Sequence, residues 1–285
     1  MQTLRDNLSA VYAGSPMLVR AALINLVFLA FVLGGLVVDD RIVTGAPVWL
    51  KPVKFASSVT ISTLSIAWMV HALPPTAGVR RASTMIAVLL TLEVMLIILQ
   101  AARGTTSHFN ADTAFDSAVF SVMGLGILIV WICSMFILWR HCRTPVADRT
   151  LAMAFRIGLA LNIIGAGVGW RMTQPFPGQI EAIEQGVRPR IVGAHTVGAP
   201  DGGAGMPITK WSLTNGDLRV PHFVGMHALQ LLPLLVVALR TRRRARQDRV
   251  ERVTLYAASA ASALLFVGVL VQALRGLPLF SLLGS

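Results

Sequence analysis

The sequence predicts an all-α integral membrane protein, a polytopic bundle of seven transmembrane helices. Of its 285 residues, 55% are hydrophobic and only 13% are charged, whereas about 25% of the residues in a soluble domain are charged. Seven segments stay apolar over about 20 residues, the length of helix that crosses about 30 Å of hydrocarbon. The alternating pattern of a membrane β-barrel does not occur, so helices are the expected way to satisfy the backbone in lipid.

The apolar segments follow one another along the chain, so we expect a single membrane domain over residues 1–285. The first segment is too long for a signal-peptide core and lacks a small-residue cleavage site, so we expect it to remain as a helix. The predicted helices cover residues 18–38, 55–73, 84–102, 118–139, 151–170, 223–239 and 255–274.

Basic residues are divided unevenly between the two sides of the predicted bundle. The N-terminal segment and the second, fourth and sixth loops hold 14 cations and four acids, and the opposite side holds ten cations and eight acids. Because cytoplasmic loops are rich in Lys and Arg, we expect the N-terminus inside and the C-terminus outside. The 14 cations are Arg5, Arg20, Arg80, Arg81, Arg140, Arg143, Arg149, Arg240, Arg242, Arg243, Arg244, Arg246, Arg249 and Arg252.

The formal net charge of +12 does not indicate nucleic-acid binding, because of where the charge lies. Seven of the 25 cations lie within residues 240–252, between two apolar segments. A basic loop beside a membrane span is explained by topology and by anionic lipid headgroups. We therefore expect the lipid bilayer as a partner and no nucleic acid. With 22 arginines against three lysines, the composition suggests a GC-rich bacterial genome and thus a cytoplasmic (inner) membrane.

Polar residues on the predicted outer side gather at helix ends. Each cation there has an ordinary interpretation, a side chain that ends its helix at the headgroup level. Taken together, these cations lie at the outer ends of several predicted helices, at the same depth in the membrane. This arrangement predicts a pocket for a carboxylate, a phosphate or a lipid headgroup. The candidate substrate-binding residues are Lys51, Lys54, Arg103, Arg171 and Arg219, and the candidate catalytic residues are His108, Asp217, His222 and His227.

The histidines leave the presence of a cofactor open. His222 and His227 are five residues apart, about 140° around a helix, so one face cannot present both to a single metal ion. A metal or a haem bound through His227, together with His108 or His222, is one alternative. A hydrogen-bonded interior histidine is the other. The two cysteines, Cys133 and Cys142, form no CxxC pattern.

Four polar residues fall inside predicted helices, where they need partners. A charge at the bilayer centre costs at least about 2.5 kcal/mol, so such a residue should face the bundle interior. We expect Glu93 either to pair with Arg156, Asn162 or Gln230, or to carry a proton. Glu93 and Gln230 are also expected to form the floor of the outer pocket.

The fifth loop, residues 172–220, is the longest outside the predicted helices. It contains a helix-like piece around Glu181 and Glu184, strand-like residues 190–197 and the glycine-rich run 198–205. A loop of this length in a compact protein is usually a lid, a binding loop or a disordered linker. Because it leads back to the cationic entrance of the sixth helix, we expect an extracytoplasmic lid over the pocket.

These features favour a membrane-embedded enzyme that acts on a lipid-like or anionic small molecule in an outward-facing pocket, with or without a metal. A proton-coupled transporter using Glu93 is the first alternative. A haem or quinone redox protein is the second, and a sensor or interaction protein is a further one. No P-loop, nucleophile elbow or haem-attachment motif narrows the choice, and the sequence leaves the oligomeric state open.

Overall fold

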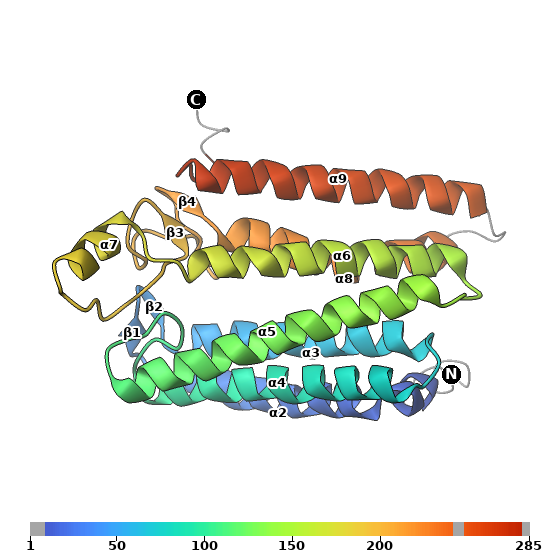
Figure 1. The fold of residues 1–285 in the computed structure, drawn as a ribbon, viewed down its shortest axis with the longest axis horizontal. Coiled ribbons are helices and arrows are strands. Elements are labelled where there is room, and N and C mark those ends of the chain that lie inside the picture. Colours follow the sequence, from blue (N-terminus) through green and yellow to red (C-terminus); the bar gives the residue numbers. More distant parts are fainter. Residues whose placement is uncertain (1–8, 242–247, 281–285) are drawn as a thin grey trace.

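The computed structural model of the chain describes residues 9–241 and 248–280. Within them, seven helices are long and apolar enough to cross a membrane, which confirms the predicted multi-pass helical bundle (Figure 1). The helices are α2 (Pro16–Val38), α3 (Leu50–His71), α4 (Ala77–Ala102), α5 (Ala114–Arg143), α6 (Arg149–Met172), α8 (Arg219–Thr241) and α9 (Asp248–Leu274).

Most of the helices begin or end several residues beyond the apolar runs that predicted them. At the starts of α4, α5 and α6, the extra residues follow polar caps, which hydropathy does not detect. Thr76 and Thr113 accept hydrogen bonds from the N–H groups of Val79 and Asp116 at the starts of α4 and α5. Asp148 caps α6 in the same way. A cap satisfies one of the N–H groups that a helix start leaves free, and so it fixes where the helix begins.

The helices form two sub-bundles. One consists of α2, α3, α4 and α5, and the other of α6, α8 and α9. The two groups lie in different halves of the view in Figure 1, joined mainly through α5 with α6 and more sparsely through α3 with α8. This division places a seam between the sub-bundles along the length of the molecule.

Helices α6 and α8 pack closely against each other because glycines meet at the centre of their contact. A Cβ atom placed on Gly165 would lie 2.7 Å from the Cα of Gly225, and one on Gly158 would lie 2.8 Å from the carbonyl oxygen of Ala228. Small residues let helix backbones approach in lipid, where van der Waals contact drives association. Gly167 on the same helix faces open space, so it is not part of this contact.

The short elements lie at one end of the bundle, which we call the loop end. They are β1 (Ile42–Val43), β2 (Ala46–Pro47), α7 (Pro177–Glu184), β3 (Thr196–Val197) and β4 (Gly216–Asp217). β1 pairs with β2 and β3 with β4, both antiparallel. The predicted helix at Glu181 and Glu184 is thus present, whereas only the last two of residues 190–197 form a strand.

The chain between α6 and α8, residues 173–218, folds over the loop end; we call it the roof segment. Val192 donates a backbone hydrogen bond to the carbonyl of Phe109 (2.8 Å), and Ala194 donates one to Met172 (3.0 Å). The amide of Gln179 donates to the carbonyl of Ile191 and accepts from the N–H of Gly193, at 2.9 Å each. These bonds tie the roof segment both to the 103–113 loop and to the end of α6.

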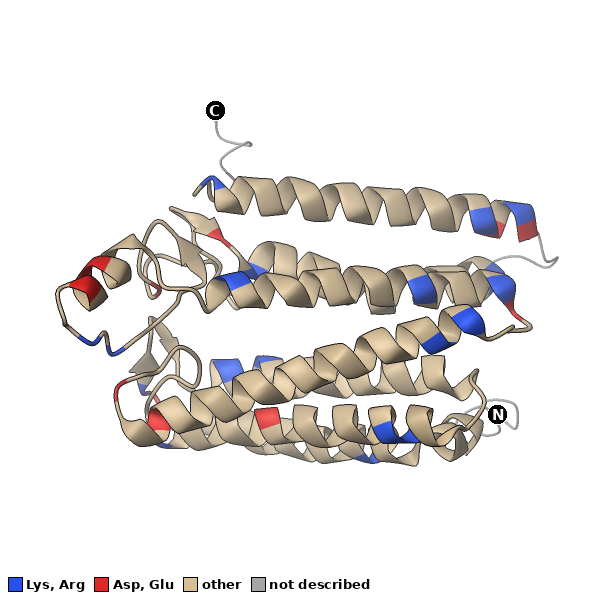
Figure 2. Cartoon of the chain, in the orientation of Figure 1, with Lys and Arg blue, Asp and Glu red and all other residues tan. Residues whose placement is uncertain are grey.

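The opposite end, which we call the arginine end, carries many of the cations that predict a cytoplasmic face. Figure 2 shows charged residues collected toward the two ends, with largely uncharged helix centres between them. Arg240 pairs with Asp148 and with the buried Glu251, and so links α8 to the starts of α6 and α9. Of the residues that predict the orientation, Arg5, Asp6, Arg242, Arg243, Arg244 and Arg246 lie outside the described residues.

The glycine contact generates a prediction. Replacing Gly165 with valine forces α6 away from α8, and such overpacking costs about 1–3 kcal/mol. We expect the Gly165→Val protein to unfold at a lower temperature in detergent than the unaltered chain. The matched Gly167→Val variant should unfold near the original temperature, because its new side chain meets open space. Equal melting temperatures for the two variants would contradict the close contact.

Candidate functional site

A cavity of about 400 Å³ lies at the loop end, beneath the roof segment. Its wall consists of the β1–β2 hairpin, the first turns of α3, the end of α4 with the 103–113 loop, the roof segment and Arg219 at the start of α8. Residues from both sub-bundles therefore face one space. The volume falls in the range of about 300–1,000 Å³ that is typical of small-molecule sites.

Four basic side chains line this cavity: Lys51, Lys54, Lys210 and Arg219. Arg219 is fixed by Asp217, whose carboxylate it contacts at 2.6 Å, and by the carbonyl of Lys210 at 2.5 Å. Lys54 donates to the carbonyl of Thr209 at 2.9 Å. Within the described residues, the ammonium groups of Lys51 and Lys210 have no hydrogen-bond partner. The cavity therefore carries more positive charge than its neighbouring carboxylates offset.

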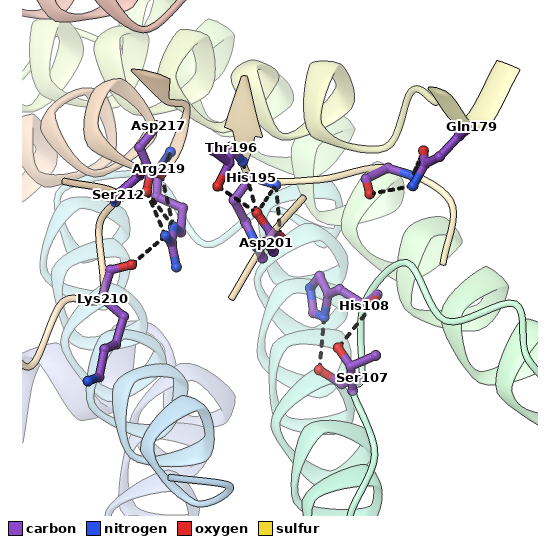
Figure 3. Close-up of polar contacts among 12 residues, drawn as sticks. Ser107, His108, Gln179, His195, Thr196, Asp201, Lys210, Ser212, Asp217 and Arg219 are labelled. Atoms are coloured by element: carbon purple, nitrogen blue, oxygen red, sulfur yellow. Dashed lines mark hydrogen bonds and ion pairs between the residues drawn. The ribbon is translucent and has the colours of Figure 1, made fainter. Parts of the chain in front are cut away.

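His195 in the roof segment forms a half-buried pair with Asp201 (Figure 3). The Nδ1 atom of His195 lies 2.6 Å from Oδ2 of Asp201, and the same carboxylate accepts hydrogen bonds from the backbone and hydroxyl of Thr196 at 2.9 Å. A carboxylate only accepts, so Nδ1 carries the ring proton. The other nitrogen, Nε2, is then unprotonated in the neutral ring and available as a base in the cavity that His195 lines.

His108 forms a second polar chain in the 103–113 loop. Its Nδ1 atom lies 3.1 Å from Oγ of Ser107, as Figure 3 shows. Its Nε2 atom lies 3.5 Å from Oε1 of Glu93, which is only 4% exposed within α4. Ser107 and His108 both line the cavity. The loop thus connects the cavity to a carboxylate about 9 residues, or about 14 Å, inside the helix end.

Burial sets the protonation of the two cavity histidines. Desolvation lowers the pKa of His108 well below its usual 6.5, and the charge of Lys51 lowers it further. Desolvation also lowers the pKa of His195, although the hydrogen bond to Asp201 partly opposes the shift. Burial raises the pKa of Asp201, but the hydrogen bonds from His195 and Thr196 outweigh it and leave the pKa lowered. At neutral pH both rings are therefore uncharged, and Asp201 is ionised.

Four of the predicted residues, Lys51, Lys54, His108 and Arg219, come together at the cavity. Asp217 lies behind them as the buried partner of Arg219. Arg103 does not line the cavity. It pairs with Asp116 at 2.5 Å and with Gln100. Arg171 is exposed at the end of α6.

His222 and His227 lie outside the cavity wall. The Nδ1 atom of His222 donates to the carbonyl of Gly165 at 2.8 Å and so helps to hold α8 against α6. His227 packs its ring against Phe223 and contacts Gln230 at 3.3 Å. In residues 9–241 and 248–280, no three His, Cys, Asp or Glu side chains group closely enough to hold one metal ion. A metal or haem at His227 thus gains no support from this arrangement.

The prediction that Glu93 pairs with Arg156, Asn162 or Gln230 was wrong. Arg156 lies toward the arginine end, where it donates to Nδ1 of His141 at 3.2 Å and to the carbonyl of the same residue at 2.8 Å. Asn162 donates to the backbone of Met226, and Gln230 contacts His227. These contacts satisfy each group within its own part of the bundle. The 103–113 loop supplies the partner of Glu93 instead, because it turns inward far enough for His108 to reach α4.

Sequence reasoning missed Ser107, His195, Asp201 and Lys210. The last three lie in irregular parts of the roof segment, where no helical or strand period relates one residue to another. The only local signal was a histidine six residues before an aspartate in a glycine-rich stretch. Comparison with known protein families, curated proteins and solved structures finds no match for this chain.

The His195–Asp201 pair generates a prediction about protonation. Because the pKa of His195 is lowered, its ring should stay neutral, with the proton on Nδ1, as the pH falls to 6.5. Asp201→Asn removes the carboxylate that selects this tautomer. We expect nitrogen NMR of labelled histidine to show protonation at Nδ1 in the unaltered chain and a shifted tautomer ratio in the variant. Asp112→Asn, an exposed loop-end control paired with Arg190, should leave the signal of His195 unchanged.

Proposed function

We propose that the chain is a membrane-embedded enzyme that acts on an anionic small molecule or lipid headgroup held in the loop-end cavity. One observation carries the proposal: a histidine oriented by a half-buried carboxylate shares a cavity with four basic side chains. The basic groups would hold a carboxylate or phosphate. The free Nε2 of His195 would then accept a proton from water or from the substrate.

The character of the cavity wall supports an enzyme over a simple binding pocket. Its polar groups are fixed by hydrogen bonds before any ligand arrives: Asp217 holds Arg219, and Asp201 holds His195. Groups fixed in advance in a partly desolvated site stabilise developing charge without reorganising during the reaction. Apolar residues such as Phe55 and Ile97 complete the wall, which suits a substrate with an apolar part.

Transport of the anion is the second candidate, and the contact between His108 and Glu93 favours it. That contact connects the cavity with a buried carboxylate through which a proton could be exchanged. The two functions differ in their products. An enzyme converts its substrate without accumulating it, whereas a proton-coupled transporter accumulates an unchanged anion inside proteoliposomes in response to a pH gradient.

We further propose that the loop end faces outward from the cytoplasmic membrane of a bacterium. In the full sequence, the side of the arginine end holds 14 cations and four acids and the side of the loop end holds ten cations and eight acids, and the side richer in Lys and Arg is expected to be cytoplasmic. Cys142 provides a natural reporter, because it is exposed at the end of α5 on the arginine side.

A membrane-impermeant maleimide should not label Cys142 in intact cells and should label it after lysis. In a Cys142→Ser background, Ile208→Cys places a thiol on a 75% exposed position of the roof segment. This thiol should react in intact cells. Labelling of Cys142 alone in intact cells would reverse the proposed orientation.

The central test of the enzyme is His195→Asn. We expect the purified chain to hydrolyse one of a small panel of probes, 4-nitrophenyl acetate, 4-nitrophenyl butyrate and 4-nitrophenyl phosphate. Loss of a general base should lower kcat about 100-fold or more with a small change in KM. The base works as the neutral ring, so activity should fall as the pH is lowered, with a midpoint below the usual 6.5 of histidine because the pKa of His195 is lowered.

His71→Asn is the matched control, since His71 ends α3 at the arginine end. It should retain the activity of the unaltered chain. Full activity in His195→Asn would contradict the role of His195, and hydrolysis of none of the three probes would count against a hydrolytic enzyme.

A further inference from the structure

We infer that Ser107 is the nucleophile of the loop-end cavity, that His108 activates it, and that the substrate is a carboxylic ester with an anionic group. The inference rests on the proposed function and assigns its reaction class. Ser107, His108 and Glu93 form a continuous chain from the cavity wall into α4.

The contacts of His108 assign a different task to each ring nitrogen. Nε2 faces the carboxylate of Glu93 at 3.5 Å, and Nδ1 faces the hydroxyl of Ser107 at 3.1 Å. With the ring proton on the carboxylate side, Nδ1 is the acceptor for the Ser107 hydroxyl. A serine, a histidine and a carboxylate in this order have the roles found in acyl-transfer triads, here with the two ring nitrogens interchanged. The 3.5 Å separation from Glu93 is long for a hydrogen bond, and catalytic contacts are often this long before substrate binds.

The surroundings of His108 hold its ring in place. Phe55 and Phe120 lie 5.6 and 6.1 Å from it between ring centres, and Phe109 lies at 6.1 Å. Three aromatic rings around an imidazole leave it few alternative rotamers. A nucleophile needs a base held in one orientation, and this packing supplies that constraint.

The backbone of the 103–113 loop is also held in an unfavourable conformation. Phe109 has a φ of 64°, in the left-handed region that side chains other than glycine rarely adopt. The side chain of Asn110 holds the loop by donating to Thr105 Oγ1 and to the carbonyl of Thr106, at 3.0 Å each. Such strain persists where surrounding contacts enforce it, and it is common at functional sites. Ser107, which is only 2% exposed, and His108 both line the cavity beside this strained turn.

The inferred reaction has two steps. Oγ of Ser107 attacks the ester carbonyl carbon, and its proton passes to Nδ1 of His108 and then to the departing alkoxide, which leaves as an alcohol. In the second step, water attacks the acyl carbon and gives its proton to His195. The bond to Oγ then breaks, the carboxylic acid is released, and the proton held by His195 passes through water to Oγ of Ser107, which leaves both histidines neutral. Lys51 and Arg219, which line the same space, would hold the anionic group during both steps.

The test uses a covalent probe of activated serines, phenylmethanesulfonyl fluoride, on the full chain in detergent. Oγ of Ser107 would displace fluoride from sulfur, which gives a sulfonyl adduct that intact-mass and peptide mass spectrometry locate. We expect one adduct, on Ser107, and none in Ser107→Ala. His108→Asn should slow its formation at least 100-fold, because the base is lost. Ser57→Ala is the control, since its hydroxyl donates to Val53 of its own helix, and it should label at the original rate.

The outcomes separate this inference from the proposed function. No adduct in the unaltered chain, an adduct on another residue, or unchanged labelling of His108→Asn would overturn the role of Ser107. If Ser107→Ala keeps ester hydrolysis while His195→Asn loses it, water attacks the ester carbonyl directly and the proposed function stands without Ser107. The result that supports both the role of Ser107 and the proposed function is a His195→Asn variant that labels at Ser107 at the original rate but no longer turns over substrate.

Discussion

The structure depends on one constraint: in hydrocarbon, every backbone N–H and C=O must find its partner within the protein. The seven helices meet this requirement along their own length. Irregular chain is confined to the two ends, and there side chains complete the hydrogen bonding. Gln179 satisfies Ile191 and Gly193, and Asn110 satisfies Thr106. The cavity exists because the loop end is the place where the backbone can leave the helix without being exposed to lipid.

Several charged side chains also find their partners within the protein, and two lysines of the cavity do not. Arg103, Arg219 and Arg240 each contact a carboxylate that is itself largely buried, so their charge is compensated. Lys51 and Lys210 have no such partner among the residues that the structure describes, and both line the cavity. Both lysines are half-buried, and holding unpaired cations in a partly desolvated cavity beside an oriented histidine is difficult to explain by stability alone. A ligand that supplies the missing negative charge would explain them.

The sequence was sufficient to predict the seven helices, because a helix in lipid must be apolar over its whole length. It also predicted that Lys51, Lys54, His108 and Arg219 meet, since each stands near a helix end at the same depth. The sequence could not show which face of each helix points toward the cavity. The close approach of α6 and α8 places His222 against Gly165, away from the cavity.

The roof segment was harder to predict than the helices. Asp201 reaches His195 only because an irregular turn returns to it, and no periodicity records such a return. The partner of Glu93 was hidden for the same reason, as it comes from a loop that turns inward through a left-handed Phe109. Tertiary contacts decide these positions, and local pattern carries little information about them.

The division into two sub-bundles has a mechanical consequence. Lys51 belongs to α3 in one sub-bundle and Arg219 to α8 in the other, and these two helices touch only sparsely. The distance between the two charges therefore depends on the relative orientation of the two sub-bundles. The lateral pressure of the surrounding lipid acts on that orientation. If the cavity holds an anion, as we propose, the spacing that it offers, and hence the size of anion it holds best, should vary with the thickness and tension of the membrane.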